Sequence, residues 1–479
     1  MADHTYDLVV IGAGPVGENV ADYAHRGGLS VVIVENELVG GECSYWACIP
    51  SKALLRPGAA LRAAQHVRGA AETVTGTLSP ADVFGRRDSV VGDYDDGGQV
   101  EWLRSAGIDL IRGRAQLSGV KQVRITALDG TVVEVEATHA VAVCTGSDPL
   151  IPPIDGLADA KPWTSRDATG ATEAPESLVV VGGGVVACEM ATVYASLGTA
   201  VTMLVRGSGL LAGQEPFAGE LVADALQGLG VDVRLGALTT AVHRTGDGGV
   251  EVTLGDGAVV AAAEILAATG RAPRTKDFGL ASVGLTDGDW LPTDDTLIVT
   301  AETNAAVPWL YAVGDVNHRA LLTHQGKYQA RAAGRVIAAR ASGDPLLTDP
   351  WGRHVATADH GAVPQVTFTD PEVASVGLTE AAARKAGRSI RTVEYDLAGV
   401  SGATVFSDDY VGRAKLVLDD DRDVVIGATF VGADVGELLQ SATVAVVGEV
   451  PIQRLWHAVP SYPTLSEIWL RLLETDGRA

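Results

Sequence analysis

Two cysteines, Cys43 and Cys48, lie five positions apart in the run Gly-Gly-Glu-Cys-Ser-Tyr-Trp-Ala-Cys-Ile-Pro-Ser-Lys that ends at Lys52. A thiol pair this close can cycle between dithiol and disulfide with little backbone movement if it lies on a helical turn. The pair can therefore store two electrons in the protein itself. Two core thiols or a metal site are weaker interpretations, because Pro50 and the glycines indicate a structured turn and no other Cys/His cluster supplies further metal ligands.

A nucleotide-binding unit precedes the cysteines. A buried strand pattern at residues 6–11 is followed by Gly12, Gly14 and Gly17, a helix, and a second apolar strand that ends in Glu35. This order of strand, glycine turn, helix, strand and acid is the dinucleotide-binding fingerprint. Gly12 permits the tight turn, Gly14 lets a pyrophosphate approach the backbone, and Gly17 lets the helix pack on the sheet. We expect Glu35 to accept hydrogen bonds from the ribose hydroxyls of an adenosine.

The same pattern returns in the middle of the chain. A strand at residues 178–181 leads into Gly182, Gly184 and Ala187, and the next strand ends at Val205 without an acid. Arg206 follows and could pair bidentately with a 2′-phosphate, which favours NADPH, although an ordinary surface arginine remains the alternative. Two nucleotide sites with a thiol pair between them predict relay chemistry.

The composition bounds the class of protein. The chain has 479 residues, of which 47% are hydrophobic and 20% charged, so it is expected to form two to four ordinary globular domains. Its net charge of -24 argues against a nucleic-acid partner or an anionic membrane surface. The polar start at residues 1–7 shows no signal peptide, and apolar runs stop short of about 20 residues. We therefore expect a soluble, cytoplasmic protein.

Taken together, the motifs resemble those of the FAD-dependent pyridine nucleotide-disulfide oxidoreductases, the relatives of dihydrolipoamide dehydrogenase, glutathione reductase and mycothione reductase. The resemblance covers essentially the whole chain. It rests on the two fingerprints, the cysteine pair that runs into Ile-Pro-Ser-Lys, two Thr-Gly turns ending at Gly146 and Gly270, the Gly314-Asp315 element and the C-terminal Pro463-Thr-Leu-Ser-Glu467.

The resemblance implies a role for each matching residue. FAD would be held by Gly12, Gly14, Gly17, Glu35, Lys52, Thr145, Gly146, Gly314 and Asp315, and NADPH by Gly182, Gly184, Ala187, Arg206 and Gly270. Cys48 would receive electrons beside the flavin and Cys43 would attack the substrate, while Lys52 would pair with Glu189. These roles are chemically reasonable, because a helix N-terminus lowers the pKa of a thiol and a buried lysine needs an acidic partner.

The resemblance also implies the fold and the assembly. The fold class is α/β, with two Rossmann-like dinucleotide-binding domains and a C-terminal α+β dimerisation domain. The expected domains are FAD-binding at 1–150 and 275–347, NAD(P)-binding at 151–274, and the interface domain at 348–479. The protein is expected to be a homodimer whose active site is shared across the interface, acting on a small-molecule disulfide, with no nucleic acid, membrane or metal as partner.

Three positions depart from the family pattern. The usual catalytic histidine is replaced by Tyr462, although Glu467 remains. A tyrosine is poorly matched to shuttling protons at pH 7, but it offers a surface for stacking a planar substrate, or it merely fills the vacated space. Trp46, between the cysteines, either lines the mouth of the active site or packs beneath it. Val185 stands where related reductases often carry a gating tyrosine.

Several functions fit these observations. The first is an NADPH-dependent reductase of a disulfide whose leaving thiol is acidic or thione-like, as in ergothioneine, because such a thiol needs little protonation. The alternatives are dihydrolipoamide dehydrogenase, which Arg206 and Tyr462 disfavour, and an NAD(P)H-dependent quinone or metal reductase. A non-enzymatic FAD-binding protein is disfavoured by the intact fingerprints and the redox pair.

Overall fold

The structure, a computed structural model, describes residues 2–301 and 307–477 of the chain. The chain divides into two compact units, which are described separately. Unit 1 comprises Met1–Pro50, Asp88–Asp148 and Arg271–His360, and unit 2 comprises Ser51–Arg87, Pro149–Gly270 and Gly361–Ala479. Within the described ranges, no helix combines the length and the apolar character that a membrane crossing requires.

Unit 1 is built on a seven-stranded sheet with the order β3-β2-β1-β6-β5-β4, in which β16 also pairs with β6. The strands are β1 (His4–Ile11), β2 (Val31–Glu35), β3 (Asp109–Arg112), β4 (Arg114–Gly119), β5 (Gln122–Thr126), β6 (Val132–Val143) and β16 (Leu310–Ala312). The pairs β1–β2, β2–β3, β1–β6 and β6–β16 are parallel. The core strand β2 is buried at every position, as expected for a strand covered on both faces.

The sequence pattern predicts two strands here, at 132–137 and 140–144, but the structure has one strand, β6, from Val132 to Val143. It is continuous because β1 pairs in parallel with both parts, from Val135 to Ala137 and from Ala140 to Val143, with a register shift between them. The first part also pairs antiparallel with β5.

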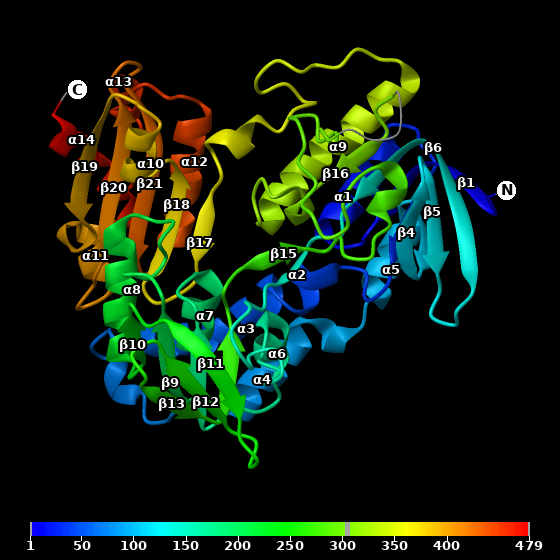
Figure 1. Cartoon of the computed structure of the whole chain (residues 1–479). Helices are drawn as coiled ribbons and strands as arrows, with labels where there is room; N and C mark the ends of the chain where they lie inside the picture. Colours follow the sequence, from blue (N-terminus) through cyan, green and yellow to red (C-terminus); the bar gives the residue numbers. More distant parts are fainter. Residues whose placement is uncertain (1, 302–306, 478–479) are drawn as a thin grey trace. The chain divides into compact units, whose positions relative to one another are not determined.

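The helices α1 (Pro15–Arg26) and α9 (Thr323–Ser342) pack together against this sheet (Figure 1). The contact is close because both helices present small residues. A Cβ atom added at Gly334 would lie 2.7 Å from the Cβ of Tyr23. The remaining elements of unit 1 include α2 (Gly41–Tyr45), α5 (Gly97–Ser105), β7 (Ser147–Pro149) and β15 (Arg271–Pro273). The helix α3 (Cys48–Gln65) begins in unit 1 and continues into unit 2.

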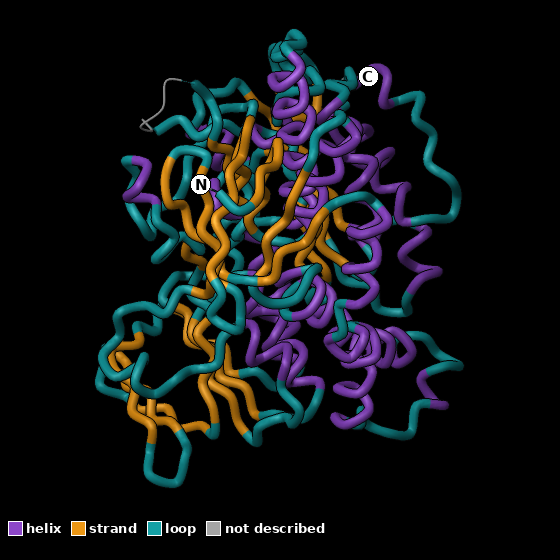
Figure 2. The backbone as a smooth tube through the Cα atoms, turned by 90° about the vertical axis from the view of Figure 1, so that its right-hand side faces the viewer, coloured by secondary structure: helices purple, strands orange, loops and turns teal. Residues whose placement is uncertain are grey.

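Unit 2 contains a parallel sheet of order β10-β9-β8-β14, an antiparallel sheet β11-β12-β13, and a five-stranded antiparallel sheet β17-β18-β21-β20-β19. The first comprises β8 (Ser177–Val181), β9 (Ala200–Val205), β10 (Asp232–Leu235) and β14 (Glu264–Ala267), and the second β11 (Thr239–Arg244), β12 (Val250–Leu254) and β13 (Val259–Ala262). The third comprises β17 (Gln365–Thr367), β18 (Glu372–Gly377), β19 (Ile390–Asp396), β20 (Arg413–Asp419) and β21 (Val424–Gly432). Figure 2 shows the strands gathered into separate sheets.

Helices cover these sheets. They are α4 (Pro80–Val90), α6 (Ser165–Gly170), α7 (Val185–Ser196), α8 (Pro216–Gly228), α10 (Glu380–Lys385), α11 (Ser401–Phe406), α12 (Leu439–Val447), α13 (Ile452–Leu455) and α14 (Ile468–Asp476). The helix α7 is buried from Ala187 to Tyr194, and α12 and α14 pack on the five-stranded sheet. The observed architecture is therefore mixed α/β with two Rossmann-type sheets and an α+β C-terminal part, as predicted.

Candidate active site

The first glycine turn has the shape that a dinucleotide requires. Gly12 adopts a φ of +101°, and a Cβ there would lie 2.5 Å from the carbonyl oxygen of Cys144. A Cβ at Gly17 would lie 1.9 Å from the carbonyl oxygen of Gly12, so these two positions close the strand against the helix. At Gly14 the nearest atom is the Cα of Gly41 at 3.9 Å. The second glycine therefore leaves the approach to the N-terminus of α1 open, as a pyrophosphate needs.

Glu35 is held in place at the end of β2. Its Oε2 accepts a hydrogen bond from the backbone N–H of Ala13 at 2.7 Å, and its Oε1 accepts from the N–H groups of Asn36 and Glu37 at 2.9 and 2.8 Å. A carboxylate can accept about four hydrogen bonds, so acceptor capacity remains for a ribose hydroxyl. These contacts fit the predicted adenosine site.

Asp315 lies in a short 3₁₀ turn, Asp315–Asn317, directly after β16. Its Oδ2 accepts a hydrogen bond of 2.6 Å from the hydroxyl of Ser147, which itself accepts one of 2.9 Å from Nε of Arg271. Burial raises the pKa of Asp315, while Ser147 and Arg271 oppose that shift. Nearby, Oγ1 of Thr145 is buried and has no hydrogen-bond partner in the described part of the chain. Buried polar groups of this kind suit the hydroxyl-rich ribityl chain of FAD.

The second glycine turn repeats the first in unit 2. Gly182 has a φ of +134°, and a Cβ there would lie 2.3 Å from the carbonyl oxygen of Ala268. A Cβ added at Gly184 would have no atom of the described residues within 4 Å. A ligand can therefore approach the N-terminus of α7. Ala187 is fully buried in the helix-packing position, and Arg206 is exposed directly after β9. These features fit a second dinucleotide.

Gly270 and Val185 also belong to this part of unit 2. The carbonyl of Gly270 accepts a hydrogen bond of 3.0 Å from the N–H of Leu150, which closes the segment after β14. Val185, the first residue of α7, is 40% exposed, so no bulky side chain of its own covers the helix N-terminus.

The cysteines lie on two successive helices. Cys43 is in α2, and Cys48 is the first residue of α3, the helix N-terminus that the sequence predicted. The Sγ of Cys48 lies 3.3 Å from Oγ1 of Thr323, and either atom can donate the hydrogen bond. Thr323 is the first residue of α9. The positive ends of two helices therefore converge on the sulfur of Cys48, an arrangement that stabilises a thiolate.

An aromatic cluster supports the loop between the two cysteines. The ring of Trp46 lies 5.7 Å from that of buried Tyr45 and 6.5 Å from that of Tyr94, measured between centroids. Burial raises the pKa of Tyr45 to about 12, so its phenol stays neutral. Trp46 is half-buried in this cluster, which is compatible both with lining the mouth of the active site and with packing beneath it.

Lys52 and Glu189 come together within unit 2. The Nζ of Lys52 lies 2.8 Å from Oε2 and 3.0 Å from Oε1 of Glu189. Phe368 contacts both residues, because its ring lies 4.8 Å beneath Nζ of Lys52 and its N–H donates a hydrogen bond of 3.0 Å to Oε1 of Glu189. The Glu189 side chain is buried, whereas the Lys52 side chain is 35% exposed. Glu189 is therefore held in place, while Lys52 remains accessible to solvent.

The C-terminal residues Tyr462 and Glu467 have different surroundings. Tyr462 is 76% exposed. Glu467 is buried, and its Oε1 accepts hydrogen bonds from the N–H groups of Gly402 at 3.0 Å and Thr464 at 3.2 Å. Those contacts form a capping box at the start of the 3₁₀ turn Leu465–Glu467 that leads into α14. Glu467 thus has a structural task whatever residue occupies position 462.

The two other cysteines are buried in the core. Burial raises the pKa of the Cys144 thiol well above its ordinary range and that of Cys188 to about 12. Both thiols are therefore protonated at neutral pH and belong to the packed core. In the described residues, no group of three or more His, Cys, Asp and Glu side chains is arranged to hold a metal ion.

Sequence reasoning missed three contact residues of the site: Thr323, Ser147 and Phe368. Thr323 gave a weak signal, since the sequence predicts a helix from about residue 324 to 341, shortly after Gly314-Asp315. Ser147 directly follows the Thr-Gly turn, but nothing in the sequence connects it to Asp315. Phe368 lies 179 positions from Glu189, and no local pattern indicates that contact.

The chain belongs to the pyridine nucleotide-disulphide oxidoreductase family, which matches residues 6–339, and its dimerisation domain matches residues 363–472. Members use FAD and NAD(P)H, so the protein is a flavoprotein disulfide oxidoreductase. The residues around both glycine turns fit these cofactors, as described above.

Curated relatives match along nearly the full length. The chain is 31% identical to dihydrolipoyl dehydrogenase of Halobacterium salinarum over 475 residues, covering 98% of this chain and 95% of the relative. It is 30% identical to glutathione reductase of Burkholderia cepacia over 481 residues, covering 98% and 99%. It is also 30% identical to mercuric reductase of Staphylococcus aureus, covering 97% and 81%.

Solved structures share the fold. LpdA of Mycobacterium tuberculosis superposes with a TM-score of 0.82 at 25% identity, covering 98% of this chain and 99% of that one. The HOCl-induced flavoprotein disulfide reductase RclA of Escherichia coli superposes with a TM-score of 0.81 at 24% identity and the same coverage, and at that identity the likeness concerns the fold alone.

Proposed function

We propose that the protein reduces a small-molecule disulfide with electrons from NADPH, passed through FAD and the Cys43–Cys48 pair. The observation that carries the proposal is the position of Cys48, at the first residue of α3 and 3.3 Å from the hydroxyl of Thr323. Bound FAD would accept hydride from the nicotinamide and deliver two electrons to the cysteine disulfide. Glu35 and Asp315 would hold FAD, and Lys52 with Glu189 would border its reactive ring.

The cysteines then perform thiol–disulfide exchange. The thiolate of Cys43 attacks one sulfur of the substrate, so that the substrate S–S bond breaks and the first thiolate leaves. Cys48 attacks the sulfur of Cys43 in turn, which restores the Cys43–Cys48 disulfide and releases the second thiol. Over the whole cycle, NADPH supplies a hydride, which amounts to two electrons and one proton. Solvent or a nearby acid supplies the second proton, so that two thiols are released.

The substrate is proposed to have an acidic or thione-like thiol, such as a mercaptoimidazole of the ergothioneine type. Tyr462 occupies the position of the family's histidine, and a phenol is a poorer proton shuttle at pH 7 than an imidazole. A thiol that leaves readily as an anion needs little protonation. The exposed ring of Tyr462 also offers a face on which a planar heterocycle can stack.

The coenzyme and the assembly follow the same proposal. Val205 ends β9 where NAD-binding folds carry an acid, and the exposed Arg206 that follows it favours the 2′-phosphate of NADPH. The dimerisation domain, together with the exposed Val444, Val459 and Tyr462, supports a homodimer. In that dimer, Tyr462 and Glu467 of one subunit would stand beside Cys43 of the other.

Dihydrolipoamide dehydrogenase activity is the second candidate, favoured by the 31% identity to such an enzyme over nearly the whole chain. Steady-state assays with oxidised mercaptoimidazole, glutathione disulfide, mycothiol disulfide and lipoamide, each with NADPH and NADH, decide between the two. The proposal expects the highest kcat/KM for the mercaptoimidazole disulfide with NADPH. Lipoamide with NAD(H) as the best pair would overturn it.

A quinone or metal reductase is separated by one variant. Cys43→Ser should abolish disulfide reduction and leave NADPH-dependent quinone reduction intact, because the flavin alone supports the latter. If disulfide reduction survives in Cys43→Ser, the exchange mechanism is wrong.

A further inference from the structure

Asp359 forms the centre of a buried polar network in unit 1. It lies in the 3₁₀ turn Thr357–His360, and its side chain is 2% exposed. Its carboxylate accepts hydrogen bonds from Nε of Arg319 at 2.7 Å, from Nε2 of Gln325 at 2.6 Å and from Nε2 of Gln329 at 3.0 Å. An ionised carboxylate only accepts, so it dictates that each neighbouring amide turns its NH₂ group inward.

Gln329 connects Asp359 to the turn that carries Asp315. The side chain is fully buried in α9. With Nε2 donated to Asp359, its Oε1 accepts hydrogen bonds from the N–H of Gly314 at 2.9 Å and from Nδ2 of Asn317 at 2.8 Å. The opposite amide orientation would set NH₂ against both of those donors and turn a carbonyl oxygen toward the carboxylate. Asp359 therefore selects the one orientation that satisfies all three contacts.

The two groups that Gln329 binds stand on either side of Asp315. Gly314 has a φ of +82°, a conformation that favours glycine, and a Cβ there would lie 3.1 Å from the side chain of Val16. Asn317 continues the turn, because its Nδ2 also donates to the carbonyl of Ala312 at 3.1 Å. One acceptor atom, Oε1 of Gln329, therefore binds residues on both sides of Asp315 and holds the backbone of this turn.

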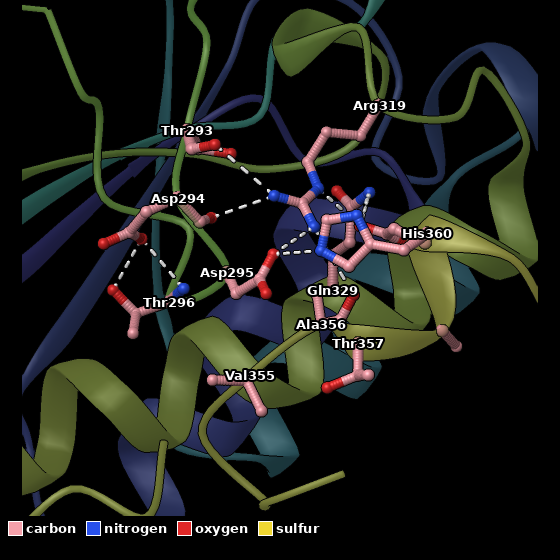
Figure 3. Close-up of polar contacts among 12 residues, drawn as sticks. Thr293, Asp294, Asp295, Thr296, Arg319, Gln329, Val355, Ala356, Thr357 and His360 are labelled. Carbon is pink, nitrogen blue, oxygen red and sulfur yellow. Dashed lines mark hydrogen bonds and ion pairs between the residues drawn. The ribbon is translucent and has the colours of Figure 1, made fainter. Parts of the chain in front are cut away.

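Arg319 ties the same turn to a second loop. Its guanidinium donates to Oδ1 of Asp295 at 2.6 Å and to the carbonyl of Asp294 at 3.1 Å, in addition to Asp359. His360 shares Asp295, with Nε2 at 2.7 Å from Oδ1 (Figure 3). Asp295 therefore anchors Arg319 without contacting either glutamine, which makes it a matched control for Asp359.

We propose that Asp359 and Gln329 are positioning residues for the flavin: through Gly314 and Asn317 they hold Asp315 where it binds the ribityl chain of FAD. The inference rests on the assignment of Asp315 to FAD made under the proposed function. In this role Asp359 accepts the hydrogen bond that orients Gln329. The proposal does not depend on the ion pair between Asp359 and Arg319.

The test compares three full-length variants, with the FAD dissociation constant of reconstituted apoprotein measured by flavin fluorescence. Asp359→Ala removes the acceptor and should weaken FAD binding about tenfold, the worth of one or two hydrogen bonds. Asp359→Asn should stay within about twofold of the parent, because its carbonyl can still receive Gln329 and Arg319 while the amide of Gln325 turns over. Asp295→Ala, the control, should also stay within about twofold.

Gln329→Met separates positioning from folding, since it leaves the Asp359–Arg319 pair intact. It should weaken FAD binding as much as Asp359→Ala, and the double variant should be no weaker than either single one. Unchanged FAD binding in Asp359→Ala, equal losses in Asp359→Ala and Asp359→Asn, or additive losses in the double variant would each overturn the inference.

Asp315→Asn distinguishes failure of this inference from failure of the assignment beneath it. If Asp315→Asn binds FAD as the parent does, the assignment of Asp315 is wrong and the inference falls with it. If Asp315→Asn loses FAD while Asp359→Ala retains it, the positioning role alone is wrong. Neither result depends on which disulfide the enzyme reduces.

Discussion

The Sγ of Cys48 lies 3.3 Å from the hydroxyl Oγ1 of Thr323, and each of these residues is the first of its helix. The sulfur therefore has a hydrogen-bonding hydroxyl and two helix N-termini as neighbours. Helix termini and charge-assisted hydrogen bonds both stabilise a thiolate, and their contributions lie in the range of about 0.5–3 kcal/mol each. Thr323 should accordingly favour the thiolate form of Cys48, the cysteine proposed to receive electrons.

Replacing Thr323 by Val should weaken the long-wavelength charge-transfer absorbance that a Cys48 thiolate gives against oxidised flavin. The volume is conserved, but the hydroxyl that can donate to the thiolate is lost. Anaerobic titration with NADPH at pH 7 measures the band at two-electron reduction. Thr323→Ser keeps the hydroxyl and serves as the control; equal bands in the Val and Ser variants would argue that the hydroxyl contributes nothing.

Replacing Tyr462 by His should broaden the substrate range toward alkyl disulfides. An imidazole titrates near pH 6.5 and can protonate a basic leaving thiolate, whereas the phenol cannot do so efficiently. The kcat/KM for glutathione disulfide or lipoamide should rise about tenfold or more relative to that for a mercaptoimidazole disulfide. Tyr462→Phe should leave the ratio of the two substrates nearly unchanged. A fall in alkyl disulfide turnover in Tyr462→His would contradict the leaving-group explanation.

Replacing Arg206 by Ala should reduce the preference for NADPH. Arg206 is exposed after β9, where its guanidinium can form charge-assisted hydrogen bonds of about 1.5–3 kcal/mol with a 2′-phosphate. The KM for NADPH should rise about tenfold or more, and that for NADH should change little. Arg234→Ala, on the neighbouring strand β10, is the control for a general loss of positive charge. Equal changes in the KM for NADPH and for NADH would show that Arg206 does not bind the 2′-phosphate.

Replacing Glu18 by Gln should remove one contribution to the pH dependence of stability. Burial raises the pKa of Glu18 to about 7 from an ordinary 4.5, with Glu35 adding to the shift and Lys327 opposing it. Because the folded state binds this proton more tightly than the unfolded state, Glu18 costs stability as the pH rises from about 4.5 through about 7.

The free energy of unfolding of the parent should fall by about 2 kcal/mol relative to Glu18→Gln across that range. Urea unfolding at pH 5, 6, 7 and 8 measures the difference. Asp22→Asn, which removes a carboxylate paired with Arg26 in the same helix, is the control. A Glu18→Gln protein that loses stability at pH 8 would reverse the sign and refute the explanation.

Replacing Phe368 by Leu should loosen the Lys52–Glu189 pair. The variant keeps the N–H that binds Glu189 but loses the ring beneath Nζ of Lys52, a contact worth about 0.5–1 kcal/mol. The free energy of unfolding should fall by about 1 kcal/mol. Phe368→Tyr keeps an aromatic ring and should match the parent; if Leu and Tyr variants are equally stable, the ring contact carries no energy.

The sequence predicted those parts of the molecule whose determinants are local. The glycine turn at Gly12, the acid at Glu35 and the helix start at Cys48 follow from spacing alone, because each motif lies within one strand–turn–helix unit. The fold class was implied by the family resemblance that these motifs carry. The two halves of β6 were wrongly separated, because their continuity depends on pairing with β1 along both halves and not on the residues of β6 alone.

Contacts between distant segments could not be predicted from one sequence. Ser147 and Asp315 are 168 positions apart, and Lys415 reaches the buried Glu215 across 200 positions. Polar residues such as Gln329 carry no periodic signal, because their burial depends on partners that only the folded chain supplies. The Asp359 network belongs to this class throughout.

The position of Asp359 also changes where the cofactor-binding part of the chain should be considered to end. The family match for that part stops at residue 339, and the helix α9 is complete at Ser342. The carboxylate that orients Gln329 stands well beyond both, two residues before unit 2 resumes at Gly361. A fragment cut at the end of α9 would retain every glycine of the first fingerprint and Asp315 itself. By the proposed positioning role, it would bind flavin poorly all the same, so truncations and domain exchanges in this protein should keep the chain through His360.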